Sequence, residues 1–150
     1  MEEGPRQGGL RGRKGARELA MQALYQWQFG DSTGQDVALE FIAHRLPAGV
    51  DETYFRELVM QATERAEELD AALGALTDRP VTQLDPVERS ALLIGYYELA
   101  HRPEVPWRVV VSEAVELCRR YGSVDGHRYV NAVLDRAARS CRPAETGAGG

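Results

Sequence analysis

Apolar residues recur every three or four positions along most of this chain, a spacing that places them on one face of successive α-helices. The first helix is predicted over about residues 14–29, with Gly30 as its stop signal. Its apolar face consists of Ala16, Ala20, Ala23, Leu24 and Trp27. A shorter helix is predicted over about residues 36–45, and Pro47 ends it.

A third and longest helix is predicted from Asp51, whose carboxylate suits an N-cap, to Pro80, which closes it. A single apolar stripe follows it over more than five turns. The stripe consists of Phe55, Leu58, Val59, Ala62, Ala66, Leu69, Leu73 and Leu76. We therefore expect one uninterrupted helix in this region.

The fourth helix has the strongest start signal in the chain. Asp85 can accept hydrogen bonds from the first free amides, and Pro86 has the backbone angle that the first helical position needs. Glu88 can reach back to complete a capping box. These residues predict a helix over about residues 86–101.

Two further helices complete the pattern. Pro106 opens a fifth helix that ends at Gly122, and a sixth is predicted over about residues 124–140. No stretch shows the alternation or the bounded β-branched runs that a strand requires. The fold class is therefore all-α.

Short connections between these helices predict a compact bundle of six to seven helices in two three-helix subdomains. The helical domain covers residues 13–142, with subdomains at about 13–79 and 80–142. Residues 1–12 and 143–150 are rich in Gly, Pro and charge, which predicts two disordered tails, the first of them basic.

Charge is unevenly distributed along the chain, whose formal net charge is -5. Residues 1–17 carry five basic and two acidic side chains, residues 36–88 four basic and twelve acidic, and residues 119–142 six basic and two acidic. Basic ends around an acidic middle are typical of a molecule with one side that faces a polyanion, provided that the ends meet in space.

Basic and aromatic side chains combine near both ends. Lys14 and Arg17 lie about one helical turn apart, Tyr25 lies two turns further along, and Tyr129 offers a second ring if the last helix packs nearby. Single-stranded RNA binds to such mixtures, with cations on phosphates and rings under bases. The predicted RNA-binding residues are Arg13, Lys14, Arg17, Tyr25, Arg119, Arg120, Arg128 and Tyr129.

Each of these residues also has a structural interpretation. A basic run of this kind is more commonly a solvated, charge-rich tail, and Tyr25 is equally typical of a core position. Arg119 and Arg120 close a helix, where cations complement the helix dipole without any ligand.

Catalysis, metal binding and membrane insertion are not predicted. His44, His101 and His127 lie in separate elements, and no metal-binding or nucleophile motif is present. We expect no cofactor and no enzyme activity. Cys118 and Cys141 lack disulfide or zinc spacing, and no apolar run approaches the roughly 20 residues that cross a bilayer. These features indicate a soluble protein of the reducing cytoplasm.

The ordered motifs of the chain resemble those of the NusB family of bacterial transcription antitermination factors, from about Arg13 to Pro143. The first half contributes Arg17-Glu18 and Ala20-Met21-Gln22-Ala23-Leu24-Tyr25-Gln26-Trp27-Gln28. The second half contributes Tyr97-Glu98-Leu99, Val105-Pro106, Ser112-Glu113-Ala114-Val115-Glu116-Leu117, Tyr121-Gly122 and Tyr129-Val130-Asn131-Ala132-Val133-Leu134-Asp135.

The resemblance implies two three-helix subdomains and a function without catalysis. NusB proteins pair with the ribosomal protein NusE, and the pair binds boxA RNA in the leaders of ribosomal RNA operons. With NusA and NusG, the complex keeps RNA polymerase from terminating. By the same resemblance, the protein-partner face includes Glu88, Asp125 and Tyr129, whereas Arg13, Lys14 and Arg17 would contact boxA with Tyr25 alongside.

Three positions depart from the family pattern. Gly15 stands where a basic residue is common, Tyr129 replaces Phe, and Ala132 replaces Gly at a place where two helices are expected to approach closely. Gly15 would weaken one phosphate contact, and Ala132 would alter the packing slightly.

Other functions and assemblies remain open on these residues. The chain could be a protein-only adaptor without RNA contact, and the same residues are compatible with a homodimer. An RNA-modifying enzyme is disfavoured because no nucleotide-binding segment precedes Gly150.

Overall fold

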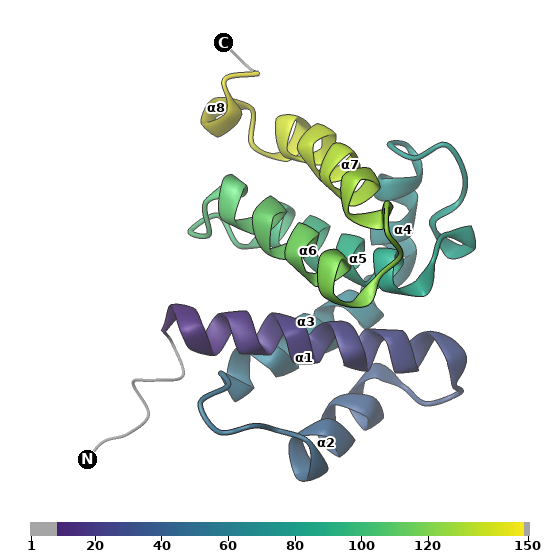
Figure 1. Ribbon diagram of the computed structural model, residues 1–150, viewed down its shortest axis with the longest axis vertical. Helices are drawn as coiled ribbons and strands as arrows, with labels where there is room; N and C mark the ends of the chain where they lie inside the picture. The colour runs from purple at the N-terminus through teal and green to yellow at the C-terminus, as the bar shows by residue number, and fades with distance from the viewer. Residues whose placement is uncertain (1–8, 149–150) are drawn as a thin grey trace. The chain divides into compact units, whose positions relative to one another are not determined.

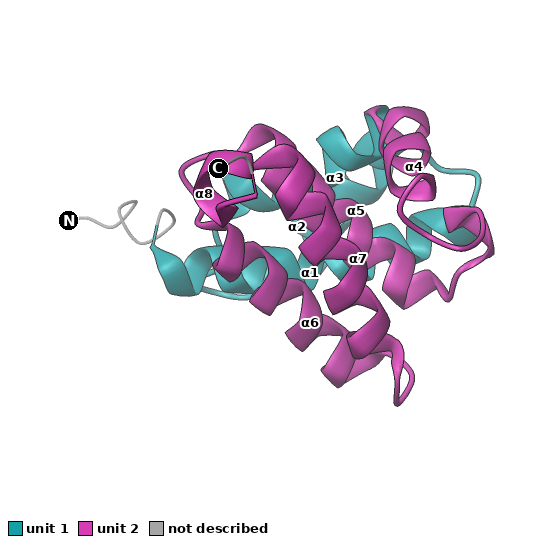
Figure 2. Cartoon of the chain, turned by 90° about the horizontal axis from the view of Figure 1, so that it is seen from above, with its two compact units in different colours: residues 1–64 teal, residues 65–150 magenta. Residues whose placement is uncertain are grey.

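The computed structural model describes residues 9–148 of the 150-residue chain, and every regular element in that range is a helix. The all-α fold class is thereby confirmed. The chain forms two compact units, residues 1–64 and residues 65–150, which Figure 2 colours separately.

Unit 1 is a three-helix packing of α1 (Leu10–Phe29), α2 (Gly34–His44) and α3 (Glu52–Glu64), in which each helix contacts the other two (Figure 1). The helices bury most of the apolar positions that their sequence periodicity predicts, but Trp27, predicted on the apolar face of α1, is only half-buried. The rings of Phe41 and Phe55 meet with centroids 6.2 Å apart. The largest fully buried side chains of this unit are Leu24, Phe41, Tyr54, Phe55 and Leu58.

Side-chain caps fix the starts of α2 and α3. The Thr33 hydroxyl accepts a hydrogen bond from the Asp36 amide at 3.1 Å, and the predicted cap Asp51 accepts one from the Tyr54 amide at 2.9 Å. The Asp51 amide in turn donates to the Gly12 carbonyl at 3.1 Å. Asp51 therefore ties the start of α3 to the first turns of α1.

Unit 2 is built around α5 (Pro86–His101), which packs against α6 (Trp107–Tyr121) and α7 (Gly126–Cys141) (Figure 1). Helix α4 (Ala66–Gly74) and the short 3-10 helix η2 (Val81–Gln83) contact α5, and α8 (Pro143–Thr146) contacts α7. The start of α5 is as predicted, because Asp85 accepts from the amides of Val87 and Glu88 at 2.8 and 3.3 Å.

The long helix predicted from Asp51 to Pro80 is interrupted. Arg65 has the non-helical angles φ -101° and ψ 16°, and its carbonyl accepts the first hydrogen bond of α4, from the Leu69 amide at 2.8 Å. Two residues before Arg65, the Thr63 hydroxyl donates to the carbonyls of Val59 and Met60 at 2.9 and 3.2 Å. Such back-bonding bends helices, and apolar periodicity does not reveal it.

The structure also differs from the predicted domain bounds. The boundary between the two units falls after Glu64, at the helix interruption, and not near Pro80. Helix α1 begins at Leu10, inside the segment predicted as a basic tail. The rest of that tail, residues 1–8, lies outside the described residues.

The segment after residue 142, predicted as a disordered tail, forms α8 and is held by Arg142. This guanidinium is only 8% exposed and donates to the carbonyls of Leu99, Val105, Glu98 and Arg102 at 2.8–3.1 Å. It also pairs with Glu145 at 2.6 Å, and the other oxygen of Glu145 accepts from the Trp107 amide at 2.8 Å. These bonds order the segment despite its low apolar content.

Candidate functional site

The predicted RNA-binding residues divide evenly between the units. Arg13, Lys14, Arg17 and Tyr25 lie on α1, whereas Arg119, Arg120, Arg128 and Tyr129 lie in unit 2. Each group is described within its own unit.

The α1 cations differ in exposure. Lys14 is exposed and Arg13 is half-buried, with its guanidinium carbon 4.2 Å from the centroid of the Tyr54 ring. Arg17 is only 5% exposed, and its guanidinium carbon lies 5.7 Å from the same ring. A buried arginine over an aromatic face has a packing role, because the ring stabilises its charge. A phosphate contact by Arg17 would require its side chain to leave this position.

Gly15 has a steric role that explains its departure from the family pattern. A Cβ atom at this position would lie 2.9 Å from Cγ2 of Val50, in the segment that precedes α3. The missing side chain allows α1 and this segment to approach closely. A basic residue here would require Val50 to shift.

Tyr25 lies at the surface of α1 and has an aromatic neighbour. Its side chain is 42% exposed, and its ring centroid lies 5.0 Å from that of Phe29, which is 66% exposed. Phe29 was missed among the predicted site residues. Its position four residues after Tyr25, outside the predicted apolar face, was the available signal.

In unit 2, Arg119 and Arg120 are exposed at the end of α6. Arg119 lies 3.9 Å from the Glu116 carboxylate, and the Arg120 guanidinium carbon lies 5.6 Å from the Tyr121 ring centroid. Both charges complement the C-terminal end of the α6 dipole. The helix dipole therefore suffices to explain both arginines without a ligand. Both side chains are nevertheless exposed and accessible to an anion.

Arg128 and Tyr129 lie in the first turn of α7. The side chain of Arg128 is 79% exposed, with Asp125 at 4.0 Å. The Tyr129 hydroxyl donates to the Asp78 carboxylate at 3.0 Å, and the Arg79 guanidinium carbon lies 5.6 Å from the ring. Burial and the bond to Asp78 raise the pKa of Tyr129. The hydroxyl group that Phe would lack at this position therefore forms a hydrogen bond within unit 2.

Glu88, which the resemblance assigns to the protein-partner face, is buried in this structure. It is 7% exposed, and its carboxylate accepts from the Ser123 hydroxyl at 3.2 Å in place of the predicted capping-box bond to the start of α5. A Cβ atom on Gly126 would lie 2.5 Å from the same carboxylate. Glu88 therefore packs against the loop between α6 and α7, through its hydrogen bond with Ser123 and its close approach to Gly126.

The α6–α7 loop exposes Val124 and Asp125 next to Ser123. Asp125 was predicted, and its side chain is 82% exposed. Val124 was not predicted and is 86% exposed. An apolar side chain beside a carboxylate, on a loop that a buried residue supports, is suited to contact a protein partner.

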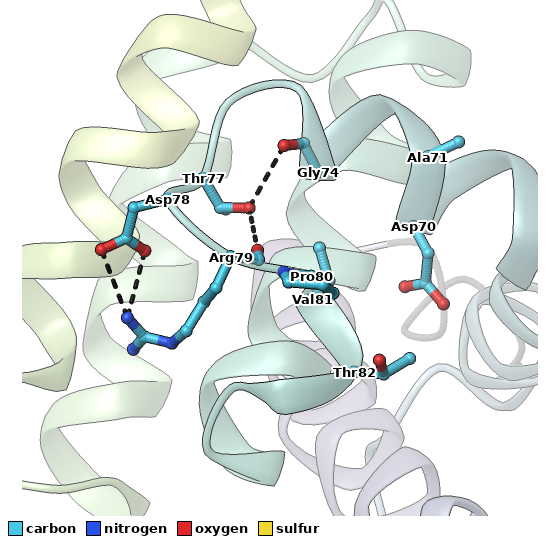
Figure 3. Close-up of a pocket in the computed structure, with 9 residues that line it drawn as sticks. All are labelled: Asp70, Ala71, Gly74, Thr77, Asp78, Arg79, Pro80, Val81 and Thr82. Atoms are coloured by element: carbon cyan, nitrogen blue, oxygen red, sulfur yellow. Dashed lines mark hydrogen bonds and ion pairs between the residues drawn. The ribbon is translucent and has the colours of Figure 1, made fainter.

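A hollow of about 540 Å³ is lined by residues of α4 and of the segment between α4 and α5, among them Asp78 (Figure 3). The Asp78 carboxylate is the one that accepts from the Tyr129 hydroxyl. Arg79 donates to both carboxylate oxygens of Asp78 at 3.1 and 3.3 Å, and the Thr77 hydroxyl donates to the Arg79 carbonyl at 2.6 Å. Asp70, on the wall formed by α4, pairs with Arg89 at 2.6 Å. Both carboxylates that line the hollow, Asp70 and Asp78, are thus paired with arginines of unit 2.

Ala132 is exposed on α7, so the close helix approach expected at this position is wrong. The methyl group meets solvent, and the replacement of Gly does not alter core packing.

Within residues 9–148, no group of three or more His, Cys, Asp and Glu side chains is arranged to hold a metal ion. The same part of the chain has no helix that is both long and apolar enough to span a bilayer.

Comparison with known proteins assigns the chain to one family. Residues 14–139 match the model of the NusB family. The chain is 50% identical over 137 residues to the transcription antitermination protein NusB of Halorhodospira halophila, a match that covers 90% of this chain and 88% of that protein. It is 46% identical over 133 residues to the transcription antitermination protein NusB of Nitrosococcus oceani, a match that covers 89% of this chain and 89% of that protein.

Solved structures agree with the sequence relatives. The structure of NusB from T. maritima superimposes with a TM-score of 0.77 at 26% identity, covering 85% of this chain and 90% of that one. A crystal structure of the antitermination factors NusB and NusE in complex with double-stranded RNA matches with a TM-score of 0.78 at 26% identity, covering 88% and 99%. The chain belongs to the NusB family of transcription antitermination proteins.

Proposed function

We propose that this protein binds boxA RNA of ribosomal RNA operon leaders together with the ribosomal protein NusE, and so prevents premature termination by RNA polymerase. The observation that carries the proposal is the exposed side of α1 in a NusB-family chain, where Lys14 and the ring of Tyr25 are accessible. The similar solved complex contains NusB, NusE and RNA, which supports both kinds of partner.

The mechanism is assembly without a catalytic step. NusE binds the α6–α7 loop with Val124 and Asp125. RNA binds Lys14 and the exposed rings of α1, and the exposed arginines of unit 2 are further RNA contacts. The complex then associates with NusA, NusG and elongating polymerase. A homodimer that covers the same residues would have to dissociate before RNA binds.

Electrostatics favours a local RNA contact over general attraction. The chain carries a net charge of -5, which repels polyanions at long range. Four basic residues and no acidic one lie between positions 11 and 17. Affinity for RNA should therefore fall with salt, with a slope set by few phosphate contacts.

The test is charge reversal at Lys14 with a matched control. Lys14→Glu exchanges an attraction for a repulsion, together about 2 kcal/mol at an exposed site, so we expect boxA affinity in the presence of NusE to fall about 10- to 30-fold. The slope of log affinity against log salt concentration should also become shallower, by the amount that one phosphate contact contributes. Fluorescence anisotropy of labelled boxA RNA measures both.

Arg56→Glu is the control, because Arg56 is an exposed cation of α3 in the same unit, with a side chain that is 49% exposed. It should leave the affinity close to that of the wild type. If the two variants bind equally well across the salt titration, Lys14 is not in the interface. If the wild type ignores boxA with NusE present, the protein-only adaptor is the better description.

A further inference from the structure

We propose that Tyr25 and Phe29 form a two-ring stacking platform for unpaired bases, and that the RNA strand runs along α1 from Lys14 to this platform. The inference deepens the proposed function and rests on it, because it names the form of RNA that α1 binds and adds Phe29 to the site.

The two rings are joined to each other and open to solvent. Their centroids lie 5.0 Å apart with an angle of 55° between the ring planes, and the side chains are 42% and 66% exposed. Solvent exposure of a phenyl group is unfavourable and has no compensation from a polar atom, unlike that of a tyrosine. An exposed aromatic pair of this kind offers a flat apolar surface on which a planar ligand can stack.

Helix geometry places the platform in line with Lys14. Tyr25 follows Lys14 by eleven residues, close to three full turns, so the two side chains lie on the same side of α1 about 17 Å apart along the axis. Phe29 lies one turn beyond Tyr25. A single strand of several nucleotides spans that distance, with a phosphate at the cation and bases at the rings.

The chemistry of this side favours RNA as the occupant. Besides Lys14, Tyr25 and Phe29, the residues on this face of α1 are Arg11, Glu18 and Gln22. Along the helix, the face thus carries two cations, one carboxylate, one amide and then the two rings. Cations, amides and rings in that order suit phosphates and bases, and stacking accepts any base because every base has a π-face. A paired A-form helix hides its base faces, so the platform requires an unpaired strand.

The experiment removes the Phe29 ring and compares affinity and its salt dependence. With NusE present, Phe29→Ala should weaken single-stranded boxA RNA about 5- to 150-fold, the loss that one stacked base represents. The slope against salt should stay that of the wild type, because the ring carries no charge. A 2-aminopurine base in the RNA should lose part of its fluorescence quenching in the same variant.

Two further variants separate stacking from simple apolar contact. Phe29→Leu keeps apolar bulk without a ring and should bind as weakly as Phe29→Ala. Leu39→Ala is the matched control, since Leu39 is 44% exposed on α2 of the same unit, and it should bind like the wild type.

Wild-type affinity in Phe29→Ala, or in Phe29→Leu, would overturn the platform while leaving RNA binding by the protein intact. An equal loss of NusE affinity in the absence of RNA would also overturn it, because the rings would then be a protein-docking surface. Failure of the wild type to bind boxA would instead overturn the proposed function.

Discussion

Glu88 shows how one buried side chain couples stability to pH. Burial is the main cause that raises the pKa of its carboxyl group, and the charge of Asp85 adds to it. The hydrogen bond from Ser123 and the charge of Arg79 act in the opposite direction but do not cancel the shift. The folded state therefore disfavours the ionised form of Glu88.

The sign of the pH effect follows from that shift. A carboxyl whose pKa is raised on folding contributes stability that is fully present below its ordinary value of 4.5, and that contribution is lost as the pH rises through the folded value. Glu88→Gln does not titrate and keeps a partner for the Ser123 hydroxyl. We expect the variant to be more stable than the wild type at pH 7 and to lose this advantage near pH 4.

Urea unfolding between pH 4 and pH 7.5 measures the difference. Glu67→Gln is the control, because Glu67 is an exposed carboxylate on α4 of the same unit. A stability gain in Glu88→Gln that is the same at every pH would contradict the assigned pKa shift.

At the scale of elements, the short helix α8 depends on one arginine. The guanidinium of Arg142 satisfies four carbonyls at the end of α5 and in the segment before α6, and it also pairs with Glu145. Helix ends leave their last carbonyls without partners, so a buried donor there is worth more than a surface ion pair.

We therefore expect Arg142→Ala to lower the free energy of unfolding by about 3 kcal/mol or more, since buried carbonyls lose their donors. Arg139→Ala, three positions before Arg142 in the last turn of α7, removes only an exposed pair with Asp135 at 3.2 Å. That control should change stability by less than about 0.5 kcal/mol. Equal effects of the two substitutions on urea unfolding would contradict the role given to Arg142.

The sequence predicted most elements because their boundary residues act locally. Asp85, Pro86 and Gly122 define helix ends through bonds and angles within a few residues. The break at Arg65 and the docking of α8 were not predictable in this way. The first depends on a side-chain hydroxyl that competes with the backbone, and the second on bonds from Arg142 to residues about 40 positions away.

The same distinction holds for the candidate site. The exposure of Lys14 and Arg128 agrees with charge and helical position. The burial of Arg17 and Glu88 depends on Tyr54 and Ser123, which are distant in sequence, so spacing alone did not reveal it. Phe29 and Val124 are apolar residues, which sequence reasoning assigns to a core unless their neighbours show otherwise.

For the whole molecule, the distribution of charge agrees with the proposal that a partner protein takes part in RNA binding. The segment of residues 36–88 has twelve acidic and four basic side chains, whereas residues 119–142 have six basic and two acidic. An acidic protein with few exposed cations gains little affinity for RNA from electrostatics alone. A second protein that contributes its own RNA contacts would raise the affinity of the pair above that of either component.

The proposed function is tested most directly by the affinity of the 150-residue protein for labelled boxA RNA. Fluorescence anisotropy measures this affinity with and without NusE, and a scrambled RNA serves as the comparison. We predict that the protein with NusE binds boxA more tightly than either protein alone and discriminates against the scrambled sequence. Equal affinity for the two RNAs, or no gain from NusE, would contradict it.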